Sequence, residues 1–461
     1  MRGSLYDQLP IVIQQGGVTW AGWRRARTRY TRRFHRRLAE WERTLHGPLD
    51  ALYAIQRRRL DQLVRRAARH VPYYADLPTP SRHPDPQRAM QETLEQIPPL
   101  EKQTYRERSA EFLARDVPRH RLHLVRTSGT TGTPLQLWHA PETIAEEYAA
   151  VWRHRRTFGV DLHDPRLAFG GQMVVPFHQQ EPPFWRTNYY GEETFFSLYH
   201  MSPEHLPHYV DHILEAPARY VQGYPSAMHL VASAMLESGR TLPPGQVKAV
   251  FTSSESLLAF QREGIEKAFA APVRDRYGVS EFAVSMTSCD QGRLHVDMEF
   301  CIVEVEAVEE TDAWFRGPLL VTGLGNDAVG FLRYRVGDVG TRLRRPCACG
   351  RPGDVFADVD GRIEDYVVTP DGRRIGRLDH IFKEQFDVAE AQILQGSREA
   401  IEVRVVPRAS WSQGSARSLR KEIRARLGDE IGVELRLVDA IEREPNGKFR
   451  AVKSRVGGSA A

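Results

Sequence analysis

The segment at residues 125–134, VRTSGTTGTP, contains seven consecutive positions, 127–133, that are only Ser, Thr or Gly. Its flanks, HLV and PLQLW, have the composition of β-strands, so it is expected to be a loop between strands. Glycines let backbone N–H groups approach an anion, and hydroxyl groups add donors to phosphate oxygens. The pattern favours a loop that binds a polyanion, although an ordinary Ser/Gly turn has the same composition. It is not a Walker loop, because no Lys follows Gly132 as that motif requires.

A second set of residues has the types found at zinc sites. SCDQGRLH supplies Cys289 and His295, and RPCACGR supplies the close pair Cys347 and Cys349. Three thiolates and one imidazole form a closed tetrahedral set that is typical of structural zinc, so we expect these side chains to meet. Plain reduced thiols are the alternative, since C-x-C spacing is less usual than C-x-x-C. Cys301 lies in the apolar stretch EFCIVEV and is expected in the core.

Length and composition describe a globular chain of two or three domains. It has 461 residues, of which 41% are hydrophobic and 27% charged. We find no run of about 18 apolar residues that would predict a membrane span, and no secretory signal pattern, so a cytoplasmic location is the default expectation. Four cysteines are too few and too clustered for a disulfide framework.

The basic residues are unusual in type and distribution. Only seven of the 64 are Lys, which makes each Lys worth attention. Eight Arg fall between Arg24 and Arg37 with no acidic residue among them. Such a patch could favour nucleic acid or an anionic membrane, and a solvated helix face is the plain alternative. Because no groove-reading motif accompanies it, we expect no nucleic-acid partner.

The periodicity of apolar residues predicts how these residues are positioned. Residues 18–70 have helical spacing, and residues 79–99 are predicted as a loop with one short helix. From about residue 120 strands and helices alternate, which is typical of parallel sheets with crossover helices. The predicted strands are RLAFGG, RYVQGYPS, VKAVFTSS and VRDRYG, and the predicted helices are 141–158, 203–214, the segment up to Leu236, and 257–269.

The pattern changes twice more toward the C-terminus. Residues 294–306, LHVDMEFCIVEVE, have period two and predict antiparallel pairing, and GPLLVTGL and GFLRYRVGDVGTR extend the same small sheet. After DVDGRIEDYV the composition changes again. Residues 366 to about 455 are predicted as a compact α+β unit, with strands IEVRVVP and VELRLVD around a helix from Ala416 to Leu427. We therefore place a domain boundary near 360–365.

Five further motifs follow the hydroxyl-rich loop in a particular order. They are GYPS at 223–226, RYGVSE at 276–281, YRVGD at 334–338, GRIED at 361–365 and EPNGK at 444–448. In this order, the series resembles the adenylate-forming superfamily, whose members activate a carboxylate with ATP. Within it, the helical entry LDALYAIQRRRLDQLVRRAARHVPYYADL and the pattern around Cys289 resemble phenylacetate-CoA ligase and the capsule-biosynthesis (CapK-like) proteins, over roughly residues 45–455. The Cys/His pattern also resembles one found in some phenylacetate-CoA-ligase-like proteins.

The resemblance implies a fold and a domain plan. The fold is α/β, with a large N-terminal domain of mixed and parallel sheets and a small mobile C-terminal α+β domain. The expected units are a basic helical extension (1–45), the large adenylation domain (46–360), a hinge (361–365) and the small domain (366–461). Glu364 occupies the hinge position, where the family normally has Asp or Lys, so the pivot is the least defined part.

The resemblance also assigns residues to ATP and Mg2+. The phosphate loop would comprise Ser128, Gly129, Thr130, Thr131, Gly132 and Thr133, and the adenine side would comprise Tyr277, Gly278 and Ser280. Asp338 would accept from the ribose hydroxyls. Glu281 would hold Mg2+, a hard cation that prefers carboxylate oxygen. Arg362 would accompany Asp338 at the domain joint, and Lys448 would be the catalytic lysine; NGK alone would otherwise be a solvated turn.

The substrates are less defined than the nucleotide. The acyl pocket would lie between the GYPS turn and YGVSE, with Tyr224, Ser253, Ser254 and Phe282 as candidate wall residues, although core packing explains them equally well. The acceptor of the acyl group would be CoA; an amine, a sugar or a carrier is the alternative, and a nucleotidyl transferase is a third class. A homodimer is also compatible with the sequence.

Overall fold

The structure is a computed structural model. It describes residues 5–126, 135–176, 178–202, 204–326, 328–360, 367–370, 374–375, 378, 387–443 and 449–456. The α-helices within these residues are α1 (Ile11–Arg29), α2 (Arg32–Thr44), α3 (Leu49–His70), α4 (Pro86–Glu95), α5 (Lys102–Glu107), α6 (Pro141–Thr157), α7 (Leu206–Glu215), α8 (Pro225–Glu237), α9 (Ala259–Phe269) and α10 (Gln413–Leu427).

The strands divide into several sheets. A two-stranded ladder joins β1 (His123–Arg126) to β2 (Gln136–His139) on either side of the hydroxyl-rich segment, as expected. The other strands are β3 (Arg166–Phe169), β4 (Trp185–Asn188), β5 (Glu193–Phe196), β6 (Tyr220–Gly223), β7 (Ala249–Ser253), β8 (Val273–Gly278), β9 (Ser285–Ser288), β10 (Leu294–Val296), β11 (Cys301–Val305), β12 (Glu309–Glu310), β13 (Trp314–Gly323), β14 (Tyr334–Leu343), β15 (Val355–Asp360), β16 (Val367–Val368), β17 (Arg374–Ile375), β18 (Val388–Gln395), β19 (Ala400–Pro407), β20 (Gly432–Leu437) and β21 (Val452–Ser454).

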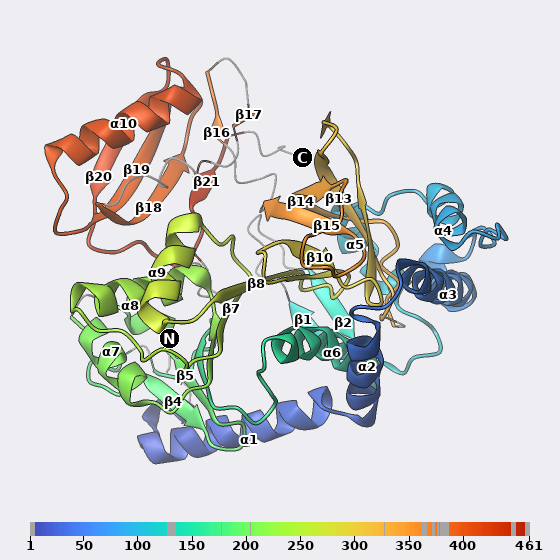
Figure 1. Cartoon of the computed structure of the whole chain (residues 1–461), viewed down its shortest axis with the longest axis horizontal. Coiled ribbons are helices and arrows are strands. Elements are labelled where there is room, and N and C mark those ends of the chain that lie inside the picture. The colour runs from blue at the N-terminus through green and yellow to red at the C-terminus, as the bar shows by residue number, and fades with distance from the viewer. Residues whose placement is uncertain are drawn as a thin grey trace.

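A 13-stranded mixed sheet runs through the large part of the chain (Figure 1). Its order is β11-β13-β14-β15-β10-β9-β8-β7-β6-β3-β5-β4, with β12 paired to β13. The segment β5-β3-β6-β7-β8 is parallel, as the alternation of strands and helices predicted. Helices α7, α8 and α9 lie beside these parallel strands. Because β6, β7 and β8 are parallel, the motifs at their C-terminal ends lie along one edge of the sheet.

The antiparallel strands continue this sheet. The prediction of a separate small sheet is therefore wrong. The junction is β9, which pairs antiparallel with β8 and with β10. The four residues of β9, SMTS, are all buried, so they show no alternation of apolar and polar residues from which a strand could be predicted. Consequently YGVSE, which precedes β9, lies in the middle of one continuous sheet.

The N-terminal helices pack directly on the large unit. Helix α1 lies against β4, and α2 lies against α6. Glu146 of α6 is fully buried and receives Arg33 at 2.7 Å, Arg37 at 2.8 Å and Arg59 of α3. Burial alone would raise the pKa of Glu146, but the three guanidinium groups hold it below its ordinary value. Part of the arginine-rich segment is therefore structural.

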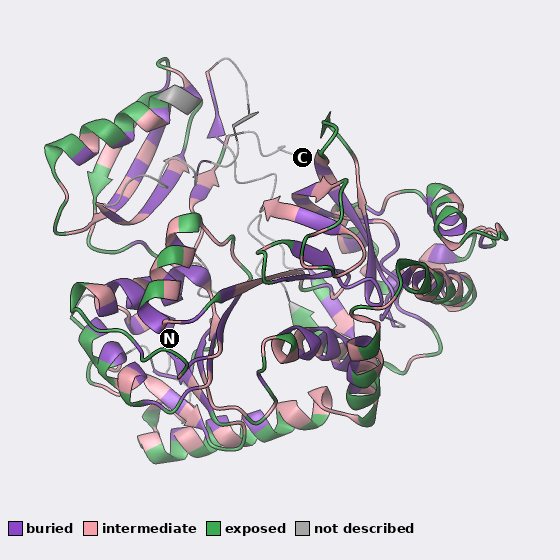
Figure 2. Cartoon of the chain, viewed as in Figure 1, coloured by how far each residue is buried: buried purple, intermediate pink, exposed green. Residues whose placement is uncertain are grey.

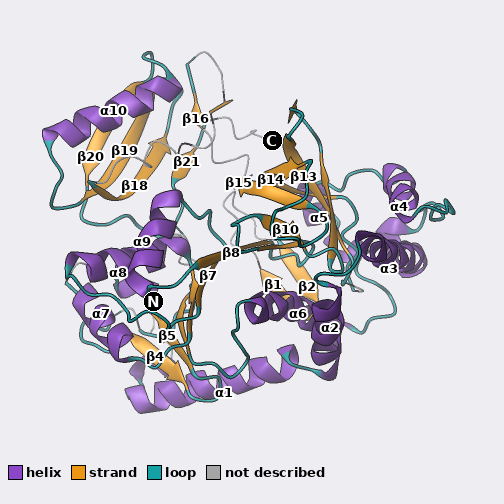
Figure 3. Ribbon diagram, in the orientation of Figure 1, coloured by secondary structure: helices purple, strands orange, loops and turns teal. Residues whose placement is uncertain are grey.

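The C-terminal unit is a smaller α+β arrangement (Figure 3). Its sheet has the order β20-β19-β18-β21, with β18 and β19 antiparallel and the two outer pairs parallel. Helix α10 covers one face of the sheet, and Leu419 and Ile423 join its core. The helix begins at Gln413, three residues before the predicted start, because Ser412 caps it by accepting from the Ser415 N–H.

The buried residues lie mainly in the strands and on the helix faces that cover them (Figure 2). The central strands and the inner faces of α6 and α8 are buried, while the outer faces of α1, α3 and α10 are exposed or half-buried. Within the described part of the chain, no helix is long and apolar enough to cross a membrane.

Candidate active site

The motif residues that the structure describes gather along the middle of the large sheet. Tyr277 and Gly278 end β8, and Ser280 and Glu281 follow in the turn before β9. Asp338 lies on β14. Two of the predicted groups are in direct contact, because the Tyr277 hydroxyl donates to Asp338 Oδ2 at 2.6 Å. These two residues are 61 positions apart in the sequence, and their motifs predicted one nucleotide site for both. The structure brings them together.

Glu281 is held by a second tyrosine from the YRVGD motif. The Tyr334 hydroxyl donates to Glu281 Oε1 at 2.9 Å, and both side chains are buried. Burial raises the pKa of Tyr334, and the neighbouring Glu281 carboxylate raises it further, so the phenol stays a donor. A buried carboxylate with an oriented hydrogen bond is a suitable ligand for a hard divalent cation.

His139 belongs to the same region and was missed by the sequence analysis. It is the last residue of β2, the strand that follows the hydroxyl-rich loop. Its Nε2 lies 2.9 Å from the backbone oxygen of Ser280. Its ring stacks on Phe282 with centroids 4.3 Å apart. Burial lowers the pKa of His139 to about 4, so the ring is neutral near pH 7 and donates to Ser280. A lone His in LWHA carries no motif, so the sequence offered no signal for it.

The candidate pocket residues include two with unusual backbone angles. Ser254 has φ of 73° and Phe282 has φ of 53°, values that non-glycine residues rarely adopt. Gly223 of the GYPS motif has φ of 152°, and a Cβ there would lie 2.2 Å from the Phe169 carbonyl oxygen, so only glycine fits. Strained residues persist where the surrounding structure fixes them, which is common at ligand sites.

Glu255 connects this edge of the large sheet to the C-terminal unit. Its carboxylate accepts from the Ser226 N–H at 3.2 Å, next to Tyr224, and from the Phe449 N–H at 2.6 Å. Burial raises its pKa, and the two N–H donors oppose that effect. Since Phe449 directly follows the predicted catalytic lysine, the structure anchors the neighbour of Lys448 at the end of β7, beside Ser253 and Ser254.

A second contact between the two units involves Arg408, just after β19. Its Nη1 lies 3.1 Å from Glu237 Oε1, and its Nη2 donates to Ser233 Oγ at 3.1 Å; both partners are on α8. If the small domain moves relative to the large unit, the contacts of Arg408 with α8 would form in one position of the small domain and break in the other.

If the chain activates a carboxylate with ATP, as its motifs imply, removing Arg408 should affect that activity more than stability. We expect Arg408→Ala to slow pyrophosphate release about two- to fivefold and to change the free energy of unfolding by less than about 1 kcal/mol, since the ion pair is partly exposed. Steady-state rates and thermal unfolding measure both. Arg404→Ala is the matched control, because Arg404 pairs with Glu402 inside the small unit. Equal rates for the two variants would show that the contact has no catalytic role.

Several predicted site residues lie outside the described part of the chain. These are Ser128, Gly129, Thr130, Thr131, Gly132 and Thr133 of the phosphate loop, Arg362 and Glu364 at the hinge, and Lys448. Their roles stay predictions.

The four predicted metal ligands do meet. Cys289 follows β9, His295 lies on β10, and Cys347 and Cys349 lie in the loop after β14. All four candidate ligand atoms lie within 4.8 Å of one another. Cys289 Sγ and Cys347 Sγ are 3.7 Å apart, and Cys349 Sγ is 3.3 Å from His295 Nε2. Sulfur ligands at ~2.3 Å from zinc in a tetrahedron have edges of ~3.8 Å, which is close to the separation of Cys289 Sγ and Cys347 Sγ. Cys301 is buried in the core, as predicted.

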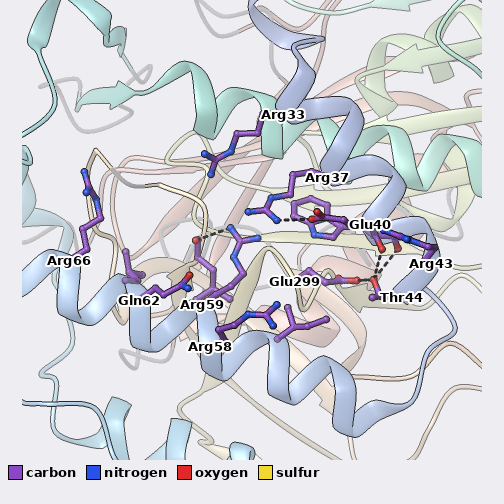
Figure 4. Close-up of a pocket in the computed structure, with 14 residues that line it drawn as sticks. Arg33, Arg37, Glu40, Arg43, Thr44, Arg58, Arg59, Gln62, Arg66 and Glu299 are labelled. Carbon is purple, nitrogen blue, oxygen red and sulfur yellow. Dashed lines mark hydrogen bonds and ion pairs between the residues drawn. The ribbon is translucent and has the colours of Figure 1, made fainter.

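A cavity of about 520 Å³ lies elsewhere, between α2 and α3 (Figure 4). Six of its lining residues are arginines: Arg33, Arg37, Arg43, Arg58, Arg59 and Arg66. Three of them, however, are paired with the buried Glu146, and Arg37 also contacts Glu40 at 2.7 Å. Glu146 and Glu40 therefore offset part of the positive charge, and we assign no ligand to this cavity.

Comparison with solved structures identifies the fold. A 2-hydroxyisobutyryl-CoA ligase in the postadenylation state, in complex with R3-HIB-AMP, matches with a TM-score of 0.67 at 19% identity, over 87% of this chain and 89% of that one. The anthranilate CoA ligase AuaEII in complex with anthranoyl-AMP matches with a TM-score of 0.50 at 14% identity, over 73% and 67% of the two chains. The chain therefore has the fold of the adenylate-forming ligases.

The particular branch is indicated by sequence. Residues 367–455 match the model of the CapK C-terminal domain. Protein CapK of Staphylococcus aureus is 22% identical over 455 residues, which is 98% of each chain. These findings confirm the CapK-like resemblance. They also correct its extent: a match over 98% of the chain includes most of residues 1–45, which we expected to lie outside it.

Proposed function

We propose that the protein activates a carboxylic acid with ATP, forming an acyl-adenylate and releasing pyrophosphate. The observation that carries this proposal is the junction of RYGVSE and YRVGD, where Tyr277 bonds to Asp338 and Tyr334 bonds to Glu281. The adenylate-forming fold supports it, because solved structures of that fold are described as complexes with acyl-AMP.

The described residues have distinct tasks in this proposal. Asp338, fixed by Tyr277, would accept hydrogen bonds from the ribose hydroxyls, while Gly278 and Ser280 would line the adenine. Glu281, oriented by Tyr334, would hold Mg2+, which screens the phosphate charges when bound. His139 positions the Ser280 backbone and, with Phe282, forms one side of the turn. Because two anions must meet, catalysis here depends on positioning and charge stabilisation.

The remaining groups complete the site and the domain plan. The hydroxyl-rich loop at 128–133 would hold the triphosphate, and Lys448 and Arg362 would supply positive charge from the small domain and the joint. That domain (366–461) would swing about residues 361–365 between the two half-reactions. Tyr224, Ser253, Ser254 and Phe282 would border the acyl group, and the half-buried rings of Tyr224 and Phe282 suit an aryl or short apolar acid.

The acceptor in this proposal is CoA, so that the protein is an acid-thiol ligase. A solved structure of the 2-hydroxyisobutyryl-CoA ligase with CoA, in the thioesterification state, supports this choice with a TM-score of 0.54. The second candidate is transfer to an amine, a sugar or a carrier. It is favoured by the similarity to Protein CapK, which covers nearly the whole chain.

The choice of acceptor can be tested directly. The purified protein is incubated with ATP, Mg2+ and a carboxylic acid that supports pyrophosphate release, with and without CoA. A CoA thioester that forms only when CoA is present supports the proposal. If instead the acyl-adenylate accumulates, is not consumed by CoA and is consumed on addition of an amine, the acceptor is not CoA and the second candidate is supported.

We also propose that Cys289, His295, Cys347 and Cys349 hold a structural zinc ion. They would tie the β9–β10 turn to the loop after β14, close to the strand that enters the hinge. Cys347→Ser should lower the zinc content from about one ion per chain to near zero, and it should lower the thermal midpoint by several degrees. Cys301→Ser is the control, since Cys301 lies outside the cluster. A metal-free preparation as stable as a zinc-loaded one would contradict the assignment.

A further inference from the structure

The outward face of α1 carries apolar side chains and arginines together. The exposed fractions are 80% for Val12, 53% for Ile13, 57% for Trp20 and 38% for Trp23. With 3.6 residues per turn these four positions fall within a sector of about 100°, and Arg27 lies in the same sector. Surface helices usually turn such a face toward the core, so this one is reversed.

The inner face of α1 holds the helix in that orientation. Val18 is buried with Ala168 and Phe195 in a small apolar cluster. Gly22 approaches β4 so closely that a Cβ would lie 2.3 Å from the Asn188 side chain. Gln14 is buried and accepts from Arg186 Nε at 2.8 Å. The helix therefore cannot rotate to bury its tryptophans without losing these contacts.

Two tyrosines extend the aromatic surface beyond the helix. Tyr189 and Tyr190 lie in the turn between β4 and β5 and are 65% and 55% exposed. The Tyr189 N–H donates to Thr19 Oγ1 at 3.2 Å, and its hydroxyl donates to Gln15 Oε1 at 2.8 Å. The turn is thus attached to α1, which lies along the outer edge of the large unit (Figure 1).

The charge of helix α1 has one sign. The helix carries Arg24, Arg25, Arg27 and Arg29 and no Asp or Glu. The guanidinium of Arg24 lies over the Trp20 ring and that of Arg27 over the Trp23 ring, each 4.8 Å from the centroid. Cations and aromatic rings therefore alternate on one exposed face.

We propose that this α1 surface, defined as Val12, Ile13, Trp20, Trp23, Arg24, Arg27, Tyr189 and Tyr190, binds the surface of an anionic lipid bilayer. Trp and Tyr rings sit well at the level of lipid headgroups, and arginines are attracted to anionic ones. A single exposed helix can lie with its axis parallel to a flat surface. The proposal is independent of the proposed catalytic function.

Other partners fit this surface less well. Two copies of the chain would bring like charges together, which opposes a dimer through this face. Single-stranded nucleic acid stacks on aromatic rings, but the exposed Val12 and Ile13 offer it nothing comparable. Aliphatic, aromatic and cationic groups on one helix face are the combination that a bilayer interface accepts.

The test is sedimentation of the full chain with lipid vesicles. We expect the protein to sediment with vesicles of equal parts phosphatidylglycerol and phosphatidylcholine, to remain in solution with pure phosphatidylcholine, and to dissociate at high salt. Arg24→Gln with Arg27→Gln should weaken the partition by about 30-fold. Trp20→Gln with Trp23→Gln should weaken it by about tenfold or more. All these side chains point outward, so thermal unfolding should be unchanged.

A matched control removes two exposed arginines elsewhere. Arg88 and Arg240 lie on or just after other helices with well-exposed side chains, and Arg88→Gln with Arg240→Gln should bind vesicles like the unmodified chain. Absence of sedimentation with anionic vesicles, or equal loss in the control variant, would overturn the proposal. So would a dimer in light scattering that the tryptophan variant converts to a monomer without any vesicle binding.

Discussion

Replacing Lys448 with Ala is expected to slow acyl-adenylate formation by about 10²- to 10³-fold, the usual loss when one charge-stabilising group is removed. In the proposed reaction the attacking carboxylate and the phosphate that it attacks are both anionic, and the positive charge of Lys448 would lower their repulsion. The backbone of the next residue, Phe449, is bonded to Glu255 at the end of β7, beside the predicted acyl pocket. Pyrophosphate release measures the rate, and thermal unfolding should be unchanged.

Two further lysine variants make this prediction specific. Lys453→Ala changes another Lys of the small unit, on β21, and should keep the full rate. Lys448→Arg should restore little activity, since the planar guanidinium is not interchangeable with a compact ammonium group. Undiminished pyrophosphate release by the Lys448→Ala variant would remove this residue from the site.

Replacing Glu281 with Gln is expected to lower ATP-dependent activity by about 100-fold at a fixed Mg2+ concentration and to raise the Mg2+ concentration needed for half-maximal rate. The amide keeps the size of the side chain and can still accept from Tyr334, so the loss would report the missing negative charge. A titration of the rate against Mg2+ measures both effects.

Controls separate the charge of Glu281 from its hydrogen bond. Tyr334→Phe removes the orienting donor at 2.9 Å but leaves the carboxylate, so it should raise the Mg2+ concentration for half-maximal rate less than Glu281→Gln does. Glu309→Gln, on the exposed strand β12, should have no effect. An unchanged Mg2+ titration in Glu281→Gln would refute the assignment.

Much of the fold could be predicted because the periodicity of its elements is strong. Helix α6 and strand β8 were predicted to within one residue. For α6, Pro141 occupies the first helical position and Gly159, with positive φ, follows the end. The continuity of the sheet was missed because β9 is wholly buried and polar in part, so no alternation marks it. Its four side chains are buried by long-range packing against β8 and β10, which a local pattern does not contain.

Motifs in the sequence predicted which residues would lie close together. Tyr277 and Asp338 were assigned to one nucleotide site from their motifs, and their contact at 2.6 Å agrees with that grouping. The four metal-ligand candidates also meet as expected. His139 and the Glu255–Phe449 bond were missed, because each depends on which backbone group a distant residue presents. The α1 surface shows the same limit: spacing predicted the helix but not which face would be exposed.

The most direct test of the central claim is pyrophosphate release by the purified protein with ATP and Mg2+ across a panel of aryl, short apolar, fatty and amino carboxylic acids. The proposal predicts release that depends on one class of acid, with AMP forming in equal amount once an acceptor is added, and no release in the absence of acid. Release without any acid, or cleavage of ATP to ADP and phosphate, would contradict an adenylate-forming enzyme.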